Sequence, residues 1–510
     1  MSQHIVMIGG GIGGLFTGAL LTKEGFTVTV LEKNAIIGGG LQCFKRHGET
    51  FETGMHILGG FMPGQSVHKI LNYLGVLDKL NFKHTDENAI DSITYGVDGK
   101  TYELPRGRKA FCAYLSQQFP AEAENMQRYM DKVYQLADEV DLFNLRHGVN
   151  NIFTHSEEFL MPADDFIASF IKDPQLRDIL AYMSPMYGGK AGHTPAFIHA
   201  IINVLYIEGS SQFVDGSQQL ATALSDIIIK GGGEIFAGDP VVDIVVEERV
   251  IQRVVTQKGK EYTGDWYISD IHPSMLFKLT GPAAFPKIYR ERVSSITNSY
   301  SAFSVYIKFK PDTQPYVNHP RYFQKKYGMI WELDAIDDVN FPKAFMYITP
   351  PSGEQGKWAS RMLVNCVMSF EEVRKWEDTT VGHRGEEYEA WKEKHMQAII
   401  DQLEQLHPGF RDTIDFCFAS SPLTIRDYYN VKEGALYGHM CDCKNLLGSQ
   451  VTIGTKVKNL LLTGQNVNLH GICGVPLTAV ETTEALVGFG SVIDKINEAY
   501  SLYKQEHNIV

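Results

Sequence analysis

The feature that most constrains the fold is a glycine-rich turn between a short strand and a helix near the start of the chain. Residues 4–8 form a largely apolar run typical of a buried parallel strand, and a helix is expected over residues 13–23. Between them stands Gly9-x-Gly11-x-x-Gly14, in the strand–turn–helix context that supports phosphate binding. Gly9 permits the tight turn, Gly11 lets the backbone approach a pyrophosphate, and Gly14 lets the helix pack on the strand. The motif therefore predicts a βαβ unit that binds a dinucleotide at the helix N-terminus.

A second strand is expected over residues 27–31, and it ends at Glu32. A carboxylate at this point accepts hydrogen bonds from ribose hydroxyls and repels a 2′-phosphate, so NADP is disfavoured. The plain structural alternative is a tight glycine turn that holds no ligand. The two features together make that alternative the weaker interpretation.

The far end of the chain contains a matching segment. Residues 459–463 include Leu460-Leu461-Leu462, are typical of a buried strand, and lead into Gly464-Gln465. We interpret this segment as the place where the chain returns to complete the cofactor site, and the combination points to FAD. Further strands over residues 234–236, 241–247, 250–257, 261–263 and 266–269 follow a helix over residues 218–229.

The nucleotide-binding elements therefore lie in separate pieces, and the stretches between them must form an inserted domain. We expect an α/β fold with a discontinuous, doubly wound, Rossmann-like FAD-binding domain and an inserted α+β substrate-binding domain. The first comprises residues 1–110, 212–290 and 435–510, and the second residues 111–211 and 291–434. Elements expected elsewhere are a hairpin around Asp98-Gly99, helices over residues 66–74, 122–140, 166–180, 195–207, 384–406 and 477–493, and strands over residues 301–309 and 361–369.

Three segments resemble the flavin-dependent amine oxidase and phytoene desaturase superfamily. They are the array GGGIGG…LEKN…GGG…FETGMH over residues 9–56, the strand around Val241, and NLLLTGQNVNLHGICGVPLTAVETTEALV over residues 459–487. With PLTIRDYYNVKEGALYG over residues 422–438, the resemblance is closest to the branch of phytoene desaturases, carotenoid isomerases and retinol saturases (all-trans-retinol 13,14-reductases). It covers both ends of the chain well and residues 110–215 loosely.

The resemblance implies FAD as the cofactor and a set of residues that bind it. These are Gly9, Gly11, Gly13, Gly14, Glu32, Lys33, Gly38, Gly39, Gly40, Leu41, Gly54, Met55, His56, Val241, Gly464, Gln465, Gly474, Val475 and Pro476. Two departures from the family pattern stand out. The usual Arg after the paired glycines is Gly40, which would loosen contacts to the ADP half, and Gly216-Ser217 replaces the usual paired glycines before the middle helix.

Catalytic side chains are harder to assign, and the catalytic acid or base is left unknown. His56, Tyr437, His470 and Cys473 fall in segments that the resemblance places near the flavin, although each also suits a packed, hydrogen-bonded role. Pro476 suits the first turn of a helix, whose N-terminus would stabilise negative charge near N1 of a reduced flavin.

Composition narrows the class of partner. The net charge of −13 argues against a nucleic-acid partner, and no stretch reaches the length of a membrane span. The seven scattered cysteines fit a reducing cytoplasm. Cys441 and Cys443 lack a second pair at zinc-finger spacing, so no metal site is expected.

We therefore expect a FAD-dependent oxidoreductase that moves hydride between flavin and a carbon–carbon bond of an apolar polyene or isoprenoid. Saturation, desaturation and isomerisation remain open, as do the electron partner and the oligomeric state. The alternatives are a flavin-containing amine oxidase, a non-catalytic flavin- or lipid-binding protein, and a redox-neutral mutase. Residues 159–206, rich in Met and aromatic residues, are expected to line a substrate channel or to touch a membrane peripherally.

Overall fold

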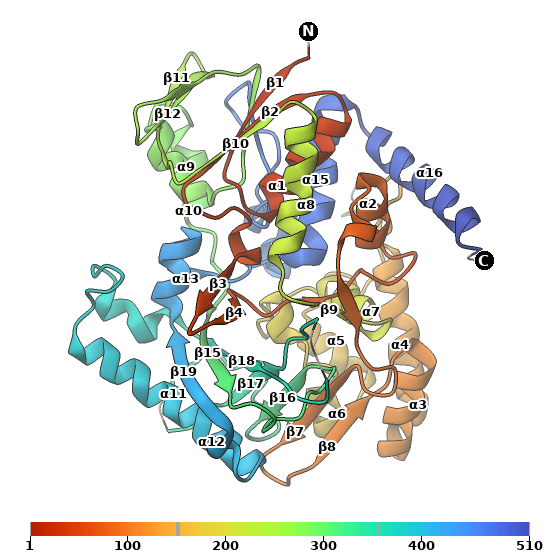
Figure 1. Cartoon of the computed structure of the whole chain (residues 1–510). Helices are drawn as coiled ribbons and strands as arrows, with labels where there is room; N and C mark the ends of the chain where they lie inside the picture. Colours follow the sequence, from red (N-terminus) through yellow and green to blue (C-terminus); the bar gives the residue numbers. More distant parts are fainter. Residues whose placement is uncertain (1, 149–153, 338, 354–355, 509–510) are drawn as a thin grey trace.

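The upper half of the molecule in Figure 1 is built on a five-stranded parallel sheet. The structure is a computed structural model that describes residues 2–148, 154–337, 339–353 and 356–508. Every neighbouring pair of strands in this sheet is parallel. In sheet order the strands are β10 (Glu234–Ala237), β2 (Thr27–Glu32), β1 (His4–Ile8), β14 (Trp266–Ser269) and β20 (Leu460–Leu462).

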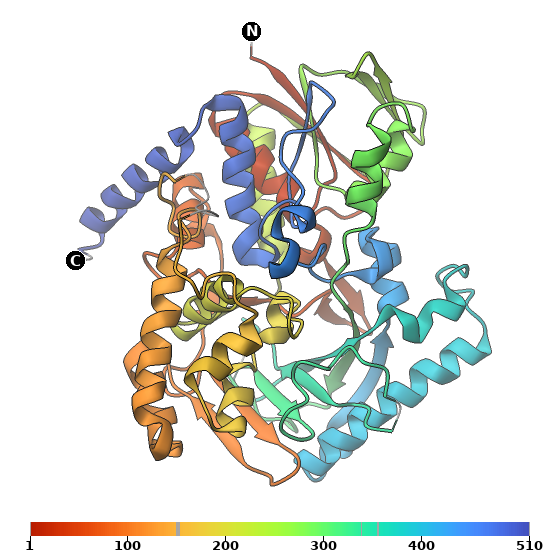
Figure 2. The ribbon, with the colours of Figure 1, turned by 180° about the vertical axis from the view of Figure 1, so that it is seen from behind.

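Both faces of this sheet are buried. Ile5 and Met7 of β1 point into one core, whereas Val6 and Ile8 point into another. The first face is covered by α1 (Ile12–Lys23), α8 (Gln218–Lys230) and α15 (Gly471–Val487), which lie side by side in Figures 1 and 2. The second is covered by β11 (Val241–Glu247), β12 (Val250–Thr256), β13 (Glu261–Tyr262), α9 (Pro273–Thr280) and α10 (Lys287–Ser294). Continuous apolar strands are what such a three-layer arrangement requires.

The two ends of the chain meet in this sheet. Leu460 of β20 pairs with Tyr267 of β14, which in turn neighbours β1. The hydroxyl groups of Thr17 and Thr463 lie 2.8 Å apart, so α1 is joined directly to the end of β20. The predicted return of the C-terminal segment to the first βαβ unit is therefore present.

The lower half is built on a seven-stranded mixed sheet. Its strands, in order, are β19 (Ile414–Ser420), β15 (Ser301–Phe309), β18 (Arg361–Met368), β17 (Ala344–Ile348), β16 (Arg321–Gln324), β7 (Asp91–Tyr95) and β8 (Thr101–Leu104). One face packs on the long helix α11 (Glu386–Leu406), and the other turns toward the rest of the molecule. The hairpin β7–β8 pairs with β16, although the predicted boundaries place it in the nucleotide-binding domain. The boundaries themselves stay a prediction.

The remaining elements pack around the two sheets, and α2 and α16 among them lie against α15 in the upper half. The helices are α2 (Ser66–Leu74), α3 (Arg108–Gln118), α4 (Ala123–Asp138), α5 (Ala163–Phe170), α6 (Pro174–Leu180), α7 (Ala196–Ile207), α12 (Phe410–Thr413), α13 (Pro422–Tyr429), α14 (Leu446–Ser449) and α16 (Ser491–Glu506). The short strands are β3 (Cys43–Arg46), β4 (Glu49–Glu52), β5 (Ile57–Leu58), β6 (Phe82–His84) and β9 (Ser211–Phe213). None of the helices in the described part of the chain combines the length and apolar character that a bilayer crossing requires.

Two predicted helices differ from the structure. The helix expected over residues 166–180 is interrupted because Asp173 caps a new helix that starts at Pro174. The helix expected over residues 477–493 is divided by Gly488 and Gly490, both with positive φ, and α15 already begins at Gly471. Pro476 therefore lies in the second turn of α15 and not in the first.

Candidate functional site

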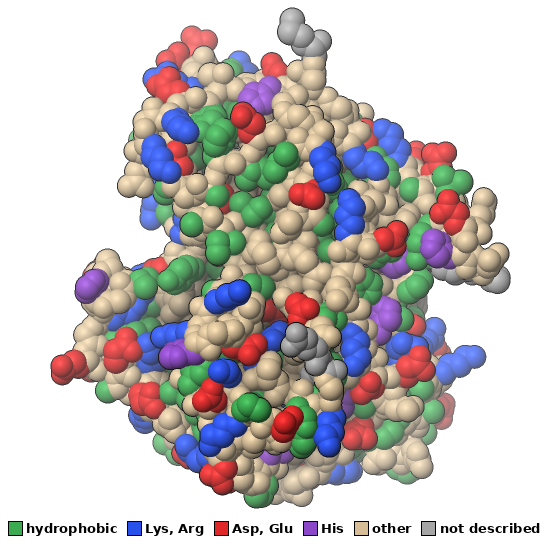
Figure 3. All heavy atoms as spheres, viewed as in Figure 1, with side chains coloured by type: hydrophobic (Ala, Val, Ile, Leu, Met, Phe, Trp, Pro, Cys, Tyr) green, Lys and Arg blue, Asp and Glu red, His purple; other side chains and the backbone are tan. Residues whose placement is uncertain are grey.

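A cavity of about 410 Å³ lies between the two sheets. It begins at the C-terminal ends of β1, β2 and β14 and extends to the inward face of the seven-stranded sheet. Such a crevice is where ligands bind in open α/β sheets, and the volume lies within the range of small-molecule sites. On the face shown in Figure 3, acidic and basic side chains are interspersed without an extended basic region.

The glycine turn and the C-terminal segment are in direct contact at one end of this cavity. A Cβ atom on Gly13 would lie 2.7 Å from the Cα atom of Gly464, and one on Gly39 would lie 3.1 Å from the Cα atom of Gly11. Gly9 and Gly464 have φ angles of +105° and +85°, which favour glycine. Three glycine segments thus form a cradle whose backbone can approach a ligand closely.

Asp270, which no sequence motif had indicated, lies inside this cradle. Its carboxylate oxygens would be 2.2–2.6 Å from Cβ atoms placed on Gly11, Gly13 and Gly464. Burial raises the pKa of Asp270 to about 7, the nearby Glu32 adds to the rise, and hydrogen bonds from the N–H groups of Gly14 and Gly11 oppose it. Its position directly after the parallel strand β14 is the signal that would have identified it.

Glu32 is held by the backbone at the end of β2. Its two carboxylate oxygens accept hydrogen bonds from the N–H groups of Gly10 (2.8 Å) and Asn34 (2.7 Å). The side chain is buried and also lines the cavity. The carboxylate is therefore fixed at the point where the sequence predicts a ribose, and its role as the ribose ligand remains a prediction.

Most of the residues predicted to bind the cofactor line this one cavity. They are Gly9, Gly11, Gly13, Glu32, Lys33, Gly39, Gly40, Leu41, Gly54, Met55, His56, Val241, Gln465 and Val475. The others, Gly14, Gly38, Gly464, Gly474 and Pro476, lie behind the wall and serve close packing. A Cβ atom on Gly14, for example, would lie 2.2 Å from the carbonyl oxygen of Gly9.

The C-terminal end of α13 and the residue that follows it also border the cavity, although no sequence motif assigns them a role in binding. Tyr428, Tyr429 and Asn430 line the wall. The hydroxyl of Tyr429 would lie 3.6 Å from a Cβ atom on Gly40, so the space where the family pattern has an Arg side chain is taken by a tyrosine.

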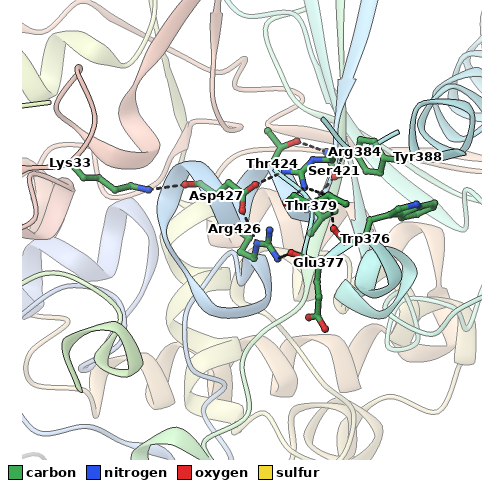
Figure 4. A network of polar contacts seen from close by, with 11 residues as sticks. Lys33, Trp376, Glu377, Thr379, Arg384, Tyr388, Ser421, Thr424, Arg426 and Asp427 are labelled. Carbon is green, nitrogen blue, oxygen red and sulfur yellow. Dashed lines mark hydrogen bonds and ion pairs between the residues drawn. The ribbon is translucent and has the colours of Figure 1, made fainter. Parts of the chain in front are cut away.

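A polar network joins this segment to the first domain (Figure 4). The Lys33 ammonium donates to the carbonyl oxygen of Asp427 (2.7 Å), and the Asn34 amide donates to that of Tyr428 (3.1 Å). The Asp427 carboxylate in turn accepts hydrogen bonds from Arg384 and Arg426. Because Arg384 is buried, these contacts fix α13 against the end of β2.

The four weak catalytic candidates all line the cavity. Burial lowers the pKa of His470 to about 4 and raises the pKa of Cys473 to about 12. Burial also raises the pKa of Tyr437 well above its usual value, so these three side chains are neutral at neutral pH. His56 differs because its Nδ1 atom lies 3.1 Å from Oε1 of the buried Glu52, which fixes the orientation of the ring.

The residues present fit a flavin dinucleotide. Glycines are needed at Gly11 and Gly13 because a Cβ atom there would meet the Asp270 carboxylate, and their bare backbone lines the cavity, where it can approach a pyrophosphate. Next to Gln465, the buried Asn466 lines the cavity with its Oδ1 atom unpartnered among the described residues, and it can accept a hydrogen bond from a polyol hydroxyl. A parallel sheet with a glycine cradle, opening onto a cavity walled by a second sheet, is the architecture of a dinucleotide-binding protein.

Comparison with known proteins gives the family. The model for flavin containing amine oxidoreductases matches residues 12–475. The all-trans-retinol 13,14-reductase of Rattus norvegicus is 25% identical over 525 residues, covering 94% of this chain and 85% of that protein. Prolycopene isomerase 2 of an Oncidium hybrid cultivar is 23% identical over 457 residues, covering 85% and 75%. The crystal structure of an oxidoreductase from Methanosarcina mazei has a TM-score of 0.66 at 16% identity, covering 94% of this chain and 100% of that chain.

The chain belongs to the flavin containing amine oxidoreductase family. It is a FAD-dependent oxidoreductase with a Rossmann-like domain and an inserted domain, which confirms the predicted fold class, cofactor and enzyme class. The similarity to the retinol reductase and the prolycopene isomerase confirms the branch that the sequence motifs indicate.

Proposed function

We propose that this enzyme acts on a carbon–carbon bond of an apolar polyene or isoprenoid. The observation that carries the proposal is the chemistry of the cavity wall away from the glycine cradle. Two stretches of the chain, 182–206 and 302–367, supply this part of the wall. None of the described residues that they contribute to the wall carries a charged side chain. These wall residues are Tyr182, Pro185, Met186, Ile202, Tyr206, Ala302, Tyr322, Phe323, Gln324, Ile330, Leu333, Ala344, Phe345, Met346, Asn365 and Val367.

An apolar substrate gains free energy in such a site, because roughly 25 cal/mol is recovered for each Å² of apolar surface removed from water. A protonated amine would lose its hydration without meeting an anion in this part of the wall. This contrast favours a polyene over an amine, although the family includes amine-oxidising enzymes by description.

Bound FAD supplies the hydride chemistry, and the protein supplies position and environment. The cradle of Gly9, Gly11 and Gly13 would hold the pyrophosphate, Glu32 the ribose, and the segment 465–475 the flavin end. The neutral states of His470 and Tyr437 keep this part of the cavity uncharged. His56, oriented by Glu52, is the side chain best placed to hold or release a proton near the substrate.

The test is reaction of the reduced holoenzyme with a polyene. The enzyme is photoreduced without oxygen and mixed with retinol or a carotenoid, and the absorbance of oxidised flavin is followed. The proposal expects oxidised flavin to return with at least one polyene and no hydrogen peroxide to form on addition of amines. The oxidised enzyme is mixed with the same polyenes as well, so that desaturation is seen as flavin reduction and isomerisation as a changed polyene. If no polyene reoxidises the reduced flavin, reduces the oxidised flavin or is isomerised, the non-catalytic binding protein is favoured, and peroxide formation with an amine would favour the amine oxidase.

The role of residues 159–206 is clearer in the structure than in the sequence. Within this fully described segment, none of the large apolar side chains is highly exposed, whereas Met186, Ile202 and Tyr206 line the cavity. The segment thus forms cavity wall. A peripheral membrane contact, which the sequence places at residues 159–206, and a cytoplasmic location stay proposals, and a protein that never co-floats with liposomes would contradict the contact.

A further inference from the structure

The C-terminal end of α13 forms part of the cavity mouth near Glu32. Tyr428 lines the cavity and yet is 50% exposed, so its side chain lies where the cavity meets solvent. Its carbonyl oxygen accepts a hydrogen bond from the side-chain amide of Asn34 (3.1 Å), and the backbone N–H of Asn34 donates to Oε1 of Glu32 (2.7 Å). Tyr428 therefore borders the end of the cavity where the sequence predicts a ribose of the dinucleotide.

A second apolar surface borders the same end and comes from the Rossmann-like domain. The backbone N–H of Gly238 donates to the carbonyl oxygen of Asn34 (2.8 Å), which fixes the segment that leads into β11 beside Asn34. Pro240 and Val241 in this segment are half-buried and line the cavity. Asn34 thus connects two segments, one from each half of the molecule, and both present surface to the cavity mouth.

The Tyr428 ring has no partner in the part of the chain that the structure describes. No hydrogen bond, ring contact or cation contact involves this side chain, and the hydrogen bond at its carbonyl oxygen belongs to the backbone. A ring that stays half in water forgoes the free energy that its burial would release, and a flat ligand in the cavity mouth can recover it. Tyr428 is therefore available to a ligand without loss of any contact within the fold.

The position of Tyr428 is fixed by the lower half of the molecule. Helix α13 packs on β15 and β19 of the seven-stranded sheet. The Asp427 carboxylate accepts hydrogen bonds from Arg384 and Arg426, and the Lys33 ammonium donates to the Asp427 carbonyl oxygen (2.7 Å) (Figure 4). The backbone of Tyr428 is thus held beside the end of β2 before any ligand binds, which lowers the entropy cost of binding.

We propose that the Tyr428 ring packs on the adenine of bound FAD, so that the lower half of the molecule completes the adenosine half of the cofactor site. The glycine motifs and Glu32 place that site in the Rossmann-like domain alone, and no motif points to α13. Every base has a π-face on which an aromatic side chain stacks, and Pro240 and Val241 can cover the other face of the same base. Because the inference concerns the cofactor, it does not depend on which substrate the enzyme uses.

The test measures how tightly the holoenzyme holds FAD. The rise in flavin fluorescence after dilution gives the Kd of FAD for the wild-type protein, Tyr428→Ala, Tyr428→Phe and the control Phe489→Ala. Phe489 is 70% exposed and does not line the cavity, so its variant removes an exposed ring elsewhere. Tyr428→Ala should raise the Kd on the order of tenfold, because a stacked ring is lost. Tyr428→Phe and Phe489→Ala should hold FAD as tightly as the wild-type protein.

A second readout separates this contact from a change in the fold. The adenine is joined to the isoalloxazine through two sugars and a pyrophosphate, so a contact to the base leaves the surroundings of the flavin ring unchanged. The absorption spectrum of Tyr428→Ala saturated with FAD should therefore match that of the wild-type protein. A shifted spectrum would overturn the proposal, because the substitution would then act through the fold. An unchanged Kd in Tyr428→Ala would refute it too, as would an equal loss of affinity in Tyr428→Phe or in Phe489→Ala.

Discussion

Replacement of Gly464 by Ala should release FAD. Gly464 has a φ of +85°, and a non-glycine residue in that region costs about 1–2 kcal/mol. The new Cβ atom would lie 2.2 Å from Oδ1 of Asp270, whereas ordinary contacts begin at 3.4 Å, so the carboxyl group must move by more than 1 Å. Forcing extra atoms into packed protein costs roughly 1–3 kcal/mol. If the cradle absorbs that cost on FAD binding, the Kd for FAD rises by roughly 5- to 150-fold.

The measurement is the flavin content of the purified variant together with the Kd of FAD by fluorescence titration. Gly259→Ala is the matched control, because Gly259 has a φ of +75° and no atom within 4 Å of the added Cβ. Gly259→Ala should lose only the about 1–2 kcal/mol of stability that a positive φ costs a non-glycine residue, and it should keep its FAD. A Gly464→Ala protein that purifies fully yellow and holds FAD as tightly as the control would show that the contact between the two chain ends does not shape the cofactor site.

Three further predictions follow from buried polar groups. Because the pKa of Asp270 is about 7 in the folded protein and near 3.8 in the unfolded chain, the folded state holds an extra proton between these values. The unfolding free energy of the flavin-free protein should therefore fall as pH rises from about 4 to 7, and denaturant titration of Asp270→Asn should show a flatter profile. Glu52→Gln should lower kcat more than it raises KM, since it disturbs the orientation of His56 rather than substrate binding, and equal kcat values would contradict this. Arg384→Leu should destabilise the protein by about 1–3 kcal/mol in urea unfolding, because Asp427 loses its buried partner. Arg253→Leu, at a much less buried ion pair, should change stability by less than about 1 kcal/mol.

The phosphate end of the site was accessible to sequence reasoning because its signals are local. The apolar run before Gly9, the spacing of Gly11 and Gly14, and the carboxylate at Glu32 each describe a strand, a turn or a strand end within one short segment. The return of Gly464 required only that one more buried strand ends in glycine. The hairpin β7–β8 was predicted for the same reason, because its turn signal is local. Its partner strand β16 lies more than 200 residues away in the chain, and no local sequence signal identifies β16 as the partner.

Which side chains line the far end of the cavity depends on the register of the strand pairs, and no local sequence pattern specifies that register. Asn365 becomes a cavity residue only because β18 presents odd-numbered positions to the cavity and even-numbered positions to α11. A shift of one residue in pairing would bury Asn365 against the helix and turn Val364 toward the substrate. Asp270 shows the same dependence, since its carboxyl group matters only because β14 lies between β1 and β20. The glycine motifs therefore identify the cofactor, while the side chains that line the far end of the cavity are set by strand pairings between distant parts of the chain.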